Sequence, residues 1–147
     1  MTNVQQRPAY LLHALVARLD VAADEMLRRE HDISYARFLV LLAVERLGTP
    51  TQRELAAEQQ VSDPAMSRTV AALAADGLLD VRTVPGNGHR RALGLTARGR
   101  GLVGAGSDLL ESAFAGLAEV AGVPVDVLSR PVQAMIGAFD DLAGASS

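Results

Sequence analysis

The sequence predicts a mainly α-helical fold that contains a single β-hairpin. Apolar residues recur at spacings of three and four along most of the chain, which is the period of amphipathic helices. Two short strand-like runs, residues 79–84 and 90–95, flank a proline- and glycine-rich reversal signal at residues 85–88. The 147 residues are 49% hydrophobic, 21% charged and only 3% aromatic, so we expect either one domain or a small domain plus a dimerisation arm, with an aliphatic core.

Two helices are expected before residue 50. The first covers residues 8–30, with Pro8 in its first turn. The second begins at Ser34, a favourable N-cap, and stops at Gly48; because it is apolar on most sides, it should be the buried central helix. The first helix carries a stripe typical of a helix–helix seam, made of Leu12, Leu15, Leu19, Ala22 and Met26.

Two shorter helices should follow, joined by a tight turn. Thr51 and Glu54 form the capping-box pattern T-x-x-E at the start of the first. After a turn at residues 59–61, Ser62 caps the second, which Gly77 ends. The inner face of this second helix consists of Met66, Val70 and Leu73.

The hairpin should lead into a helix from Thr96 to about residue 121, and a final helix should follow the break at residues 122–124. Pro131 either kinks that last helix or marks its first turn, with Ser129 as the cap. Within the single chain 1–147, we therefore expect a compact part at 34–98 and flanking helices at 8–30 and 99–143. The last helix carries another apolar stripe, Leu128, Val132, Met135, Phe139 and Leu142, and both terminal stripes indicate dimerisation.

Charge is distributed unevenly along the chain, whose net charge is −3. Residues 51–100 hold seven arginines and five acids, a net charge of +2, whereas residues 101–147 have a net charge of −5. Only the middle third is therefore suited to face an anionic polymer. Every basic residue is arginine, so arginine, backbone N–H groups and short polar side chains must make any phosphate or base contact.

This order of elements is a helix-turn-helix followed by a hairpin wing. Small side chains around a single arginine let a helix enter the major groove of DNA, and a wing arginine suits the minor groove. Because side chains alternate along a strand, only one of Arg90 and Arg91 should reach DNA. The outward residues of the capped helix are Ser62, Pro64, Ala65, Ser67, Arg68 and Thr69, and the wing offers Asn87, His89, Arg90 and Arg91.

The sequence resembles the MarR-type winged helix-turn-helix regulators over about residues 8–143. The resemblance is strongest in the segments ISYARFLVLLAVERLG (33–48), TQRELAAEQQVSDPAMSRTVAALAADGLL (51–79) and ALGLTARGR (92–100). It implies a homodimer that binds a pseudo-palindromic site in double-stranded DNA, usually as a repressor. The family's Asp-x-Arg wing pattern is replaced here by the residues Asn87-Gly88-His89-Arg90, so the ion pair of that pattern is absent.

The resemblance also implies release from DNA by a small, often aromatic and anionic, ligand. The family's ligand cleft lies between the dimerisation helices and the winged helix. The residues here that could approach such a cleft are Tyr10, His13, Tyr35 and Arg37.

Other classes of function have little support in the sequence. The chain has no cysteine and no nucleophile or phosphate-loop motif, and Glu30-His31-Asp32 lacks metal-ligand spacing, so we expect no metal, no cofactor and no enzyme activity. The polar N-terminus and the short apolar runs indicate a cytoplasmic protein without a membrane partner. The alternative function is the same fold acting as a protein-interaction or non-specific architectural DNA-binding module.

Overall fold

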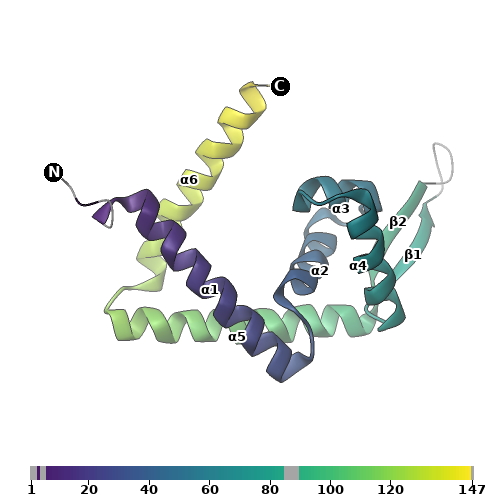
Figure 1. Ribbon diagram of the computed structural model, residues 1–147, viewed down its shortest axis with the longest axis horizontal. Coiled ribbons are helices and arrows are strands. Elements are labelled where there is room, and N and C mark those ends of the chain that lie inside the picture. Colours follow the sequence, from purple (N-terminus) through teal and green to yellow (C-terminus); the bar gives the residue numbers. More distant parts are fainter. Residues whose placement is uncertain (1–2, 4–5, 85–89, 147) are drawn as a thin grey trace. The chain divides into compact units, whose positions relative to one another are not determined.

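The computed structural model describes residues 3, 6–84 and 90–146, with the backbone alone at 84 and 90. Contacts divide the chain into two compact units, Met1–Asp108 and Leu109–Ser147. The described residues form six helices and one two-stranded antiparallel hairpin, which confirms the predicted fold class (Figure 1).

The first unit contains every element of the predicted helix-turn-helix and wing. Each boundary falls within about two residues of the position expected from the sequence. The elements are α1 (Pro8–His31), α2 (Tyr35–Leu47), α3 (Gln52–Gln59), α4 (Asp63–Ala75), β1 (Leu79–Val84), β2 (Arg90–Leu95) and the beginning of α5 (Ala97–Ala121).

Local capping interactions fix the starts of these helices. The Ser34 hydroxyl oxygen accepts a hydrogen bond from the backbone N–H of Arg37 at 3.2 Å. At α3, the Thr51 hydroxyl accepts from the Glu54 N–H at 3.1 Å, and the Glu54 carboxylate accepts from the Thr51 N–H at 3.0 Å. The predicted capping box is therefore confirmed, with two otherwise unpaired helix N–H groups satisfied.

Helix α2 is the central helix of the first unit, as its apolar sequence predicts. Phe38, Leu41 and Val44 are completely buried, and the helix contacts α1, α3 and β2. Helix α5 approaches Phe38 so closely that a Cβ on Gly106 would lie 2.4 Å from Cε2 of the ring. A glycine at 106 therefore allows α5 to close this core.

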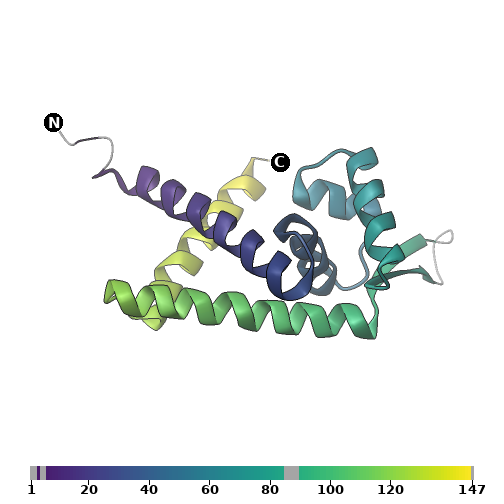
Figure 2. The ribbon, with the colours of Figure 1, turned by 60° about the horizontal axis from the view of Figure 1, so that its bottom comes forward.

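The hairpin is anchored at its base and projects from the helices (Figure 2). Its register pairs Leu79 with Leu95 at the base and Thr83 with Arg91 toward the tip. Leu79, Leu93 and Leu95 are buried on one face of the base. The N–H of Leu93 also donates to the Pro50 carbonyl at 2.7 Å, which ties β2 to the loop between α2 and α3.

The second unit consists of the end of α5 and the helix α6 (Val125–Ala145). Gly122, with φ of +70°, breaks the chain between them. Pro124 is the N-cap of α6, so the predicted alternative in which Ser129 caps this helix is wrong. Ser129 lies inside the helix, where its hydroxyl donates to the Val125 carbonyl at 3.1 Å, and the helix continues through Pro131. Because proline has no amide hydrogen, it interrupts one helical hydrogen bond there without ending the helix.

No residue of α6 is buried within the chain. Its apolar side chains form one stripe along the helix, and the fraction of Phe139 that is exposed reaches 74%. The other large exposed members of this stripe are Val132, Met135, Ile136 and Leu142.

Among the described residues, no single helix is long and apolar enough to cross a membrane. Helices α5 and α6 meet the length and composition criteria only when taken together, and they are bent by 111° at the break between them.

Candidate nucleic-acid interface

Helix α4 is capped and oriented by its own sequence. Ser62 precedes it in an extended conformation, and its hydroxyl oxygen accepts from the Ala65 N–H at 3.2 Å. Met66, Val70 and Leu73 are buried, as predicted for the inner face. Burial of these three side chains fixes the rotation of α4 about its axis. The opposite face of the helix is therefore exposed to solvent.

The exposed face of α4 contains one large side chain among small ones. Ser62, Pro64, Ser67 and Arg68 are exposed, whereas Ala65 and Thr69 are half-buried. The Thr69 hydroxyl donates to the Ala65 carbonyl at 3.2 Å, so its oxygen remains available only as an acceptor. Within the described ranges, the Arg68 guanidinium makes no hydrogen bond or ion pair, which leaves all its donors free for a ligand.

The turn before α4 holds the two helices of the motif together. Gln60 adopts the left-handed conformation, with φ of +54°, and its N–H donates to the Ala57 carbonyl at 3.2 Å. The N–H of Val61 donates to the Ala56 carbonyl at 3.0 Å. Leu55 of α3 is completely buried. Helix α3 is therefore a fixed support for α4, against which it packs (Figure 1).

The structure extends the exposed face of α4 beyond the predicted residues. Ala71 and Ala75 are exposed, and their positions three and seven residues after Arg68 place them on the same side of the helix. Arg53, exposed on α3, is a further cation of this motif. The helical period of the sequence could have identified both alanines.

The wing presents Arg91 near its described end. Arg91 is exposed and pairs with Thr83 across the hairpin. In the backbone register, Arg90 pairs with Val84. Two predicted wing residues, Asn87 and His89, lie outside the described residues, as does the side chain of Arg90.

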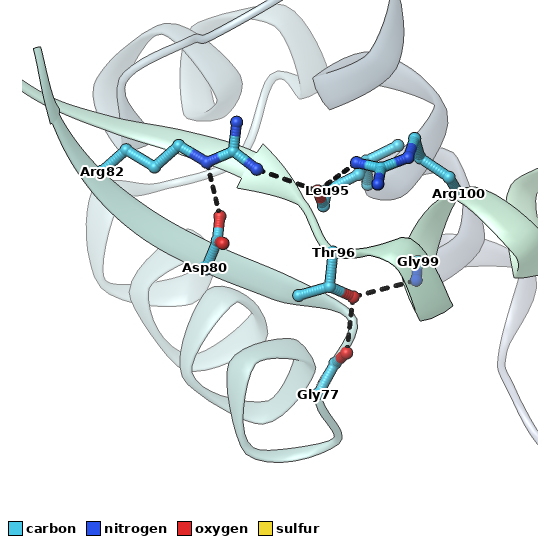
Figure 3. A network of polar contacts seen from close by, with 7 residues as sticks. All are labelled: Gly77, Asp80, Arg82, Leu95, Thr96, Gly99 and Arg100. Carbon is cyan, nitrogen blue, oxygen red and sulfur yellow. Dashed lines mark hydrogen bonds and ion pairs between the residues drawn. The ribbon is translucent and has the colours of Figure 1, made fainter.

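Thr96 joins the end of α4 to the start of α5 (Figure 3). Its hydroxyl donates to the Gly77 carbonyl at 2.6 Å and accepts from the Gly99 N–H at 3.0 Å, so it also caps α5. A Cβ on Gly99 would lie 2.2 Å from the Leu78 carbonyl oxygen. This close backbone approach requires glycine at 99 and fixes the junction between the wing and α5.

A second set of contacts at the base of the wing was not predicted from the sequence. Arg82 of β1 pairs with Asp80 and donates to the Leu95 carbonyl, and Arg100 of α5 donates to the same carbonyl (Figure 3). The spacing of Asp80 and Arg82, two residues apart on one face of a strand, was the only available sequence signal.

The first unit contains a cavity of about 390 Å³ whose lining is rich in charge. His31, Arg37 and Arg98 line it together with the carboxylates Asp32 and Asp76. None of these five side chains forms an ion pair with a described residue. The described residues include no group of three His, Cys, Asp or Glu side chains that could hold a metal ion.

Of the four residues expected at a ligand cleft, only Arg37 lines this cavity. Tyr10 and His13 are exposed on α1. Tyr35 is half-buried at the start of α2, where burial, together with the negative charge of Asp20, raises the pKa of its phenol. The structure thus does not bring these four side chains together around the cavity.

The described elements define a winged helix-turn-helix protein, and comparisons with known proteins find the same fold. Residues 31–92 match the model of the MarR family. The fold resembles a MarR family transcriptional regulator from Silicibacter pomeroyi, with a TM-score of 0.79, 20% identity and coverage of 94% of this chain and 91% of that one. None of the curated proteins matches the chain. The family-model match covers less than half of the chain, and the solved structures share its winged helix-turn-helix fold.

Two further solved structures of this fold contain a ligand. The Staphylococcus aureus MepR–DNA complex has a TM-score of 0.69 and 18% identity, with 93% of this chain and 99% of that chain covered. A Mycobacterium tuberculosis MarR family protein in complex with salicylic acid has a TM-score of 0.68 and 22% identity, with 90% and 96% covered. At these identities the likeness establishes the fold.

Proposed function

We propose that this chain is a sequence-specific DNA-binding transcription regulator that acts as a homodimer. The observation that carries the proposal is the exposed face of α4, where small residues surround the unpartnered guanidinium of Arg68. The major groove is about 12 Å wide and admits a helix whose leading side chains are small. In this proposal Arg68 makes the bidentate contact to guanine that is the commonest specific arginine contact in the major groove.

The wing and the distribution of charge along the chain also support DNA binding. Arg91 is exposed on a hairpin that Thr96 and Gly99 fix to the motif. An arginine in this position suits the narrow minor groove beside the site read by α4. Residues 51–100 have a net charge of +2, whereas residues 101–147, with a net charge of −5, are unsuited to phosphates.

The uncovered stripe of α6 supports homodimerisation. A second copy would bury Phe139, Met135 and Leu142, which no part of the chain buries. Leu11, Leu12 and Leu15 of α1 are also exposed in the first unit. A two-fold dimer would place two copies of α4 in successive major grooves, with half-sites about 10 bp apart in a pseudo-palindromic operator.

A small anion is the expected effector, and its binding would release the protein, acting as a repressor, from DNA. Arg37 and Arg98 line the cavity of the first unit, form no ion pair with a described residue, and suit a carboxylate, and the His31 ring lies beside them as a further hydrogen-bonding group. Asp76 and Leu78 also line it, directly after α4, so a ligand there can bias the position of that helix. The salicylic acid complex of the M. tuberculosis relative indicates salicylate as the first probe.

The effector part has its own test. Salicylate should weaken operator binding by wild-type protein, and Arg98→Ala should abolish this response while retaining DNA binding. Arg130→Ala, which removes an exposed arginine from α6, is the control and should respond like wild type. A full salicylate response in Arg98→Ala would refute this location of the effector site.

The proposed function requires no catalysis and no cofactor, and a chromosome-binding regulator of this kind would act in the cytoplasm.

DNA binding is tested by selection from a random pool of duplexes. The selected sequence and a shuffled copy should then be compared by fluorescence anisotropy at two salt concentrations. We expect at least about 10³-fold preference for the selected duplex and a log–log salt slope of about −0.9 per phosphate contacted. Equal, salt-dependent binding to both duplexes would favour a non-specific architectural module, and no DNA binding would favour a protein-interaction module.

A further inference from the structure

Arg82 lies across the face of the hairpin that points away from Arg91. Its cross-strand neighbour in the register is Ala92, and that of Asp80 is Gly94. Because directly paired residues share a face, Asp80, Arg82, Ala92 and Gly94 occupy one side of the hairpin. Arg91 pairs with Thr83 and therefore belongs to the other side.

The guanidinium of Arg82 connects both strands to the junction with α5. Its Nε atom lies 3.0 Å from Oδ1 of Asp80, and its Nη2 donates to the Leu95 carbonyl at 3.2 Å. Nη1 of Arg100 donates to the same carbonyl at 3.0 Å. Leu95 is the last residue of β2, so two arginines, one from β1 and one from α5, meet where the strand gives way to the helix (Figure 3). We call Arg82, Arg100 and the Leu95 carbonyl the arginine bridge.

Small residues on β2 make room for this bridge. A Cβ on Gly94 would lie 2.7 Å from both Cζ and Nε of Arg82, closer than real Cβ contacts allow. Ala92, opposite Arg82, is completely buried despite its small side chain. The guanidinium can therefore lie flat across the strand only because residue 94 has no side chain.

The bridge is too exposed to be explained as a source of stability. Arg82 and Asp80 keep 48% and 47% of their side chains exposed, and exposed ion pairs contribute little to folding. What the bridge does fix is geometry, because planar guanidinium groups hold their acceptors in defined directions. It limits the angle between the hairpin and α5 where β2 ends and α5 begins.

We infer that Arg82 and Arg100 are positioning residues for the wing, and that Gly94 leaves the space that the Arg82 guanidinium occupies. Together they hold the hairpin so that Arg91, on the far face, meets DNA in register with α4. Arg82 itself does not contact DNA. This inference rests on the proposed DNA-binding function and adds the residues that set the wing for it.

Gly94→Ala tests the bridge without removing a charge. The added methyl group must displace the guanidinium of Arg82, a flexible side chain, so the protein should fold normally. We expect Gly94→Ala and Arg82→Ala each to weaken binding to the selected duplex on the order of tenfold, the size of effect expected when one groove contact is lost. Arg29→Ala, which removes a comparable exposed ion pair from α1, is the matched control and should bind like wild type. Wild-type affinity in Gly94→Ala would overturn the inference.

A double-mutant cycle separates positioning from direct contact. If Gly94 and Arg82 act through Arg91, then combining either variant with Arg91→Ala should add little to the loss caused by Arg91→Ala alone. Multiplied losses in the double variants would mean that Arg82 contacts DNA itself, and no loss in Arg91→Ala would mean that the bridge does not serve this residue. Either result overturns the inference.

Amide hydrogen exchange of the free protein tests the bridge without DNA. Gly94→Ala and Arg82→Ala should accelerate exchange in residues 79–84 and 91–95 while α2 and α4 keep wild-type protection. Unchanged exchange in the hairpin, or equal acceleration throughout the first unit, would contradict a positioning role. If the wild-type protein selects no DNA sequence, the proposed function fails, and exchange still decides whether the bridge holds the wing.

Discussion

The two units of this chain differ in how they cover their apolar surface. In the first unit, Phe38, Leu55 and Leu73 are completely buried by residues of the same unit. In the second unit, α6 buries none of its 21 residues, and Phe139 and Leu142 are 74% and 71% exposed. The first unit therefore has a buried core, although Leu11, Leu12 and Leu15 of α1 remain exposed. The second unit has a long apolar helix that its own residues do not cover.

This difference indicates that the two units have separate roles, one in presenting α4 and the wing and the other in association. The first unit holds the fixed geometry needed to present α4 and the wing. The second unit has the features of an association surface, because large apolar side chains lie exposed along one stripe of α6. The stability of the second unit should therefore depend on protein concentration, whereas that of the first should depend on it only weakly.

The largest expected effect comes from placing a charge in the α6 stripe. Phe139→Asp would bury carboxylates at a dimer interface, and we expect the dimerisation constant to fall by more than about 100-fold. Sedimentation velocity at several concentrations measures this change. Ala134→Asp places the same charge on the opposite side of the helix and should leave the dimer intact. An unchanged dimer in Phe139→Asp would remove the proposed contrast between the units.

Arg68→Ala should damage DNA reading without affecting association. Loss of a base contact should cost about 1–3 kcal/mol in operator binding, and sequence preference should relax at one position of each half-site. Anisotropy with single-base variants of the selected duplex measures both quantities. Arg130→Ala in the second unit removes one positive charge as well, and we expect wild-type affinity from it. If both variants lost the same binding affinity, Arg68 would contribute only general electrostatic attraction to DNA.

Paired glycine substitutions in α5 should show how tightly the first unit is packed. Gly106→Ala would force a methyl group against the ring of Phe38 and should destabilise the protein by about 1–3 kcal/mol. Gly104→Ala meets no atom within 4 Å and should stabilise the helix by up to about 1 kcal/mol. Urea unfolding of both variants checks the opposite signs. Equal stabilisation by both substitutions would show that the side chains around Phe38 can shift to accommodate a methyl group.

Features that depend on neighbouring residues were predictable from the sequence. Ser34, Thr51 and Ser62 cap their helices because a capping side chain needs only the next three residues. The buried face of α4 followed from its helical period. The Arg82–Leu95 contact was not predictable, because its two residues are thirteen positions apart and meet only through the hairpin register.

The candidate ligand cavity shows the same limit. Arg37 was predicted for a ligand cleft, but Arg98 of α5 and Asp76 after α4 reach the cavity only through the tertiary fold. Pro131 is a different case, since local propensity favoured a kink or a helix start there, whereas α6 begins earlier at Val125 and tolerates one missing hydrogen bond.

The smallest expected effect is the acid sensitivity of the link between α1 and α2. Oδ1 of Asp24 accepts from the Tyr35 N–H at 2.9 Å and Oδ2 pairs with Arg28, and these contacts lower the pKa of Asp24 below its ordinary value of 3.8. Its contribution to stability is therefore fully present above pH 3.8 and is lost as the pH falls through the lowered value. Asp24→Asn should remove this part of the acid dependence of unfolding, measured by circular dichroism between pH 2 and 6. An identical profile in the variant would contradict the role of this link.

The central claim is that the first unit reads DNA while the second brings two copies together to do so. The most direct test is the mass of the complex between the full-length protein and the selected duplex, measured by size-exclusion chromatography with light scattering. We predict two chains on one duplex for the wild-type protein, and loss of that complex in Phe139→Asp at concentrations where its helices remain folded. A single chain bound to each duplex, with wild-type affinity retained in Phe139→Asp, would contradict the claim.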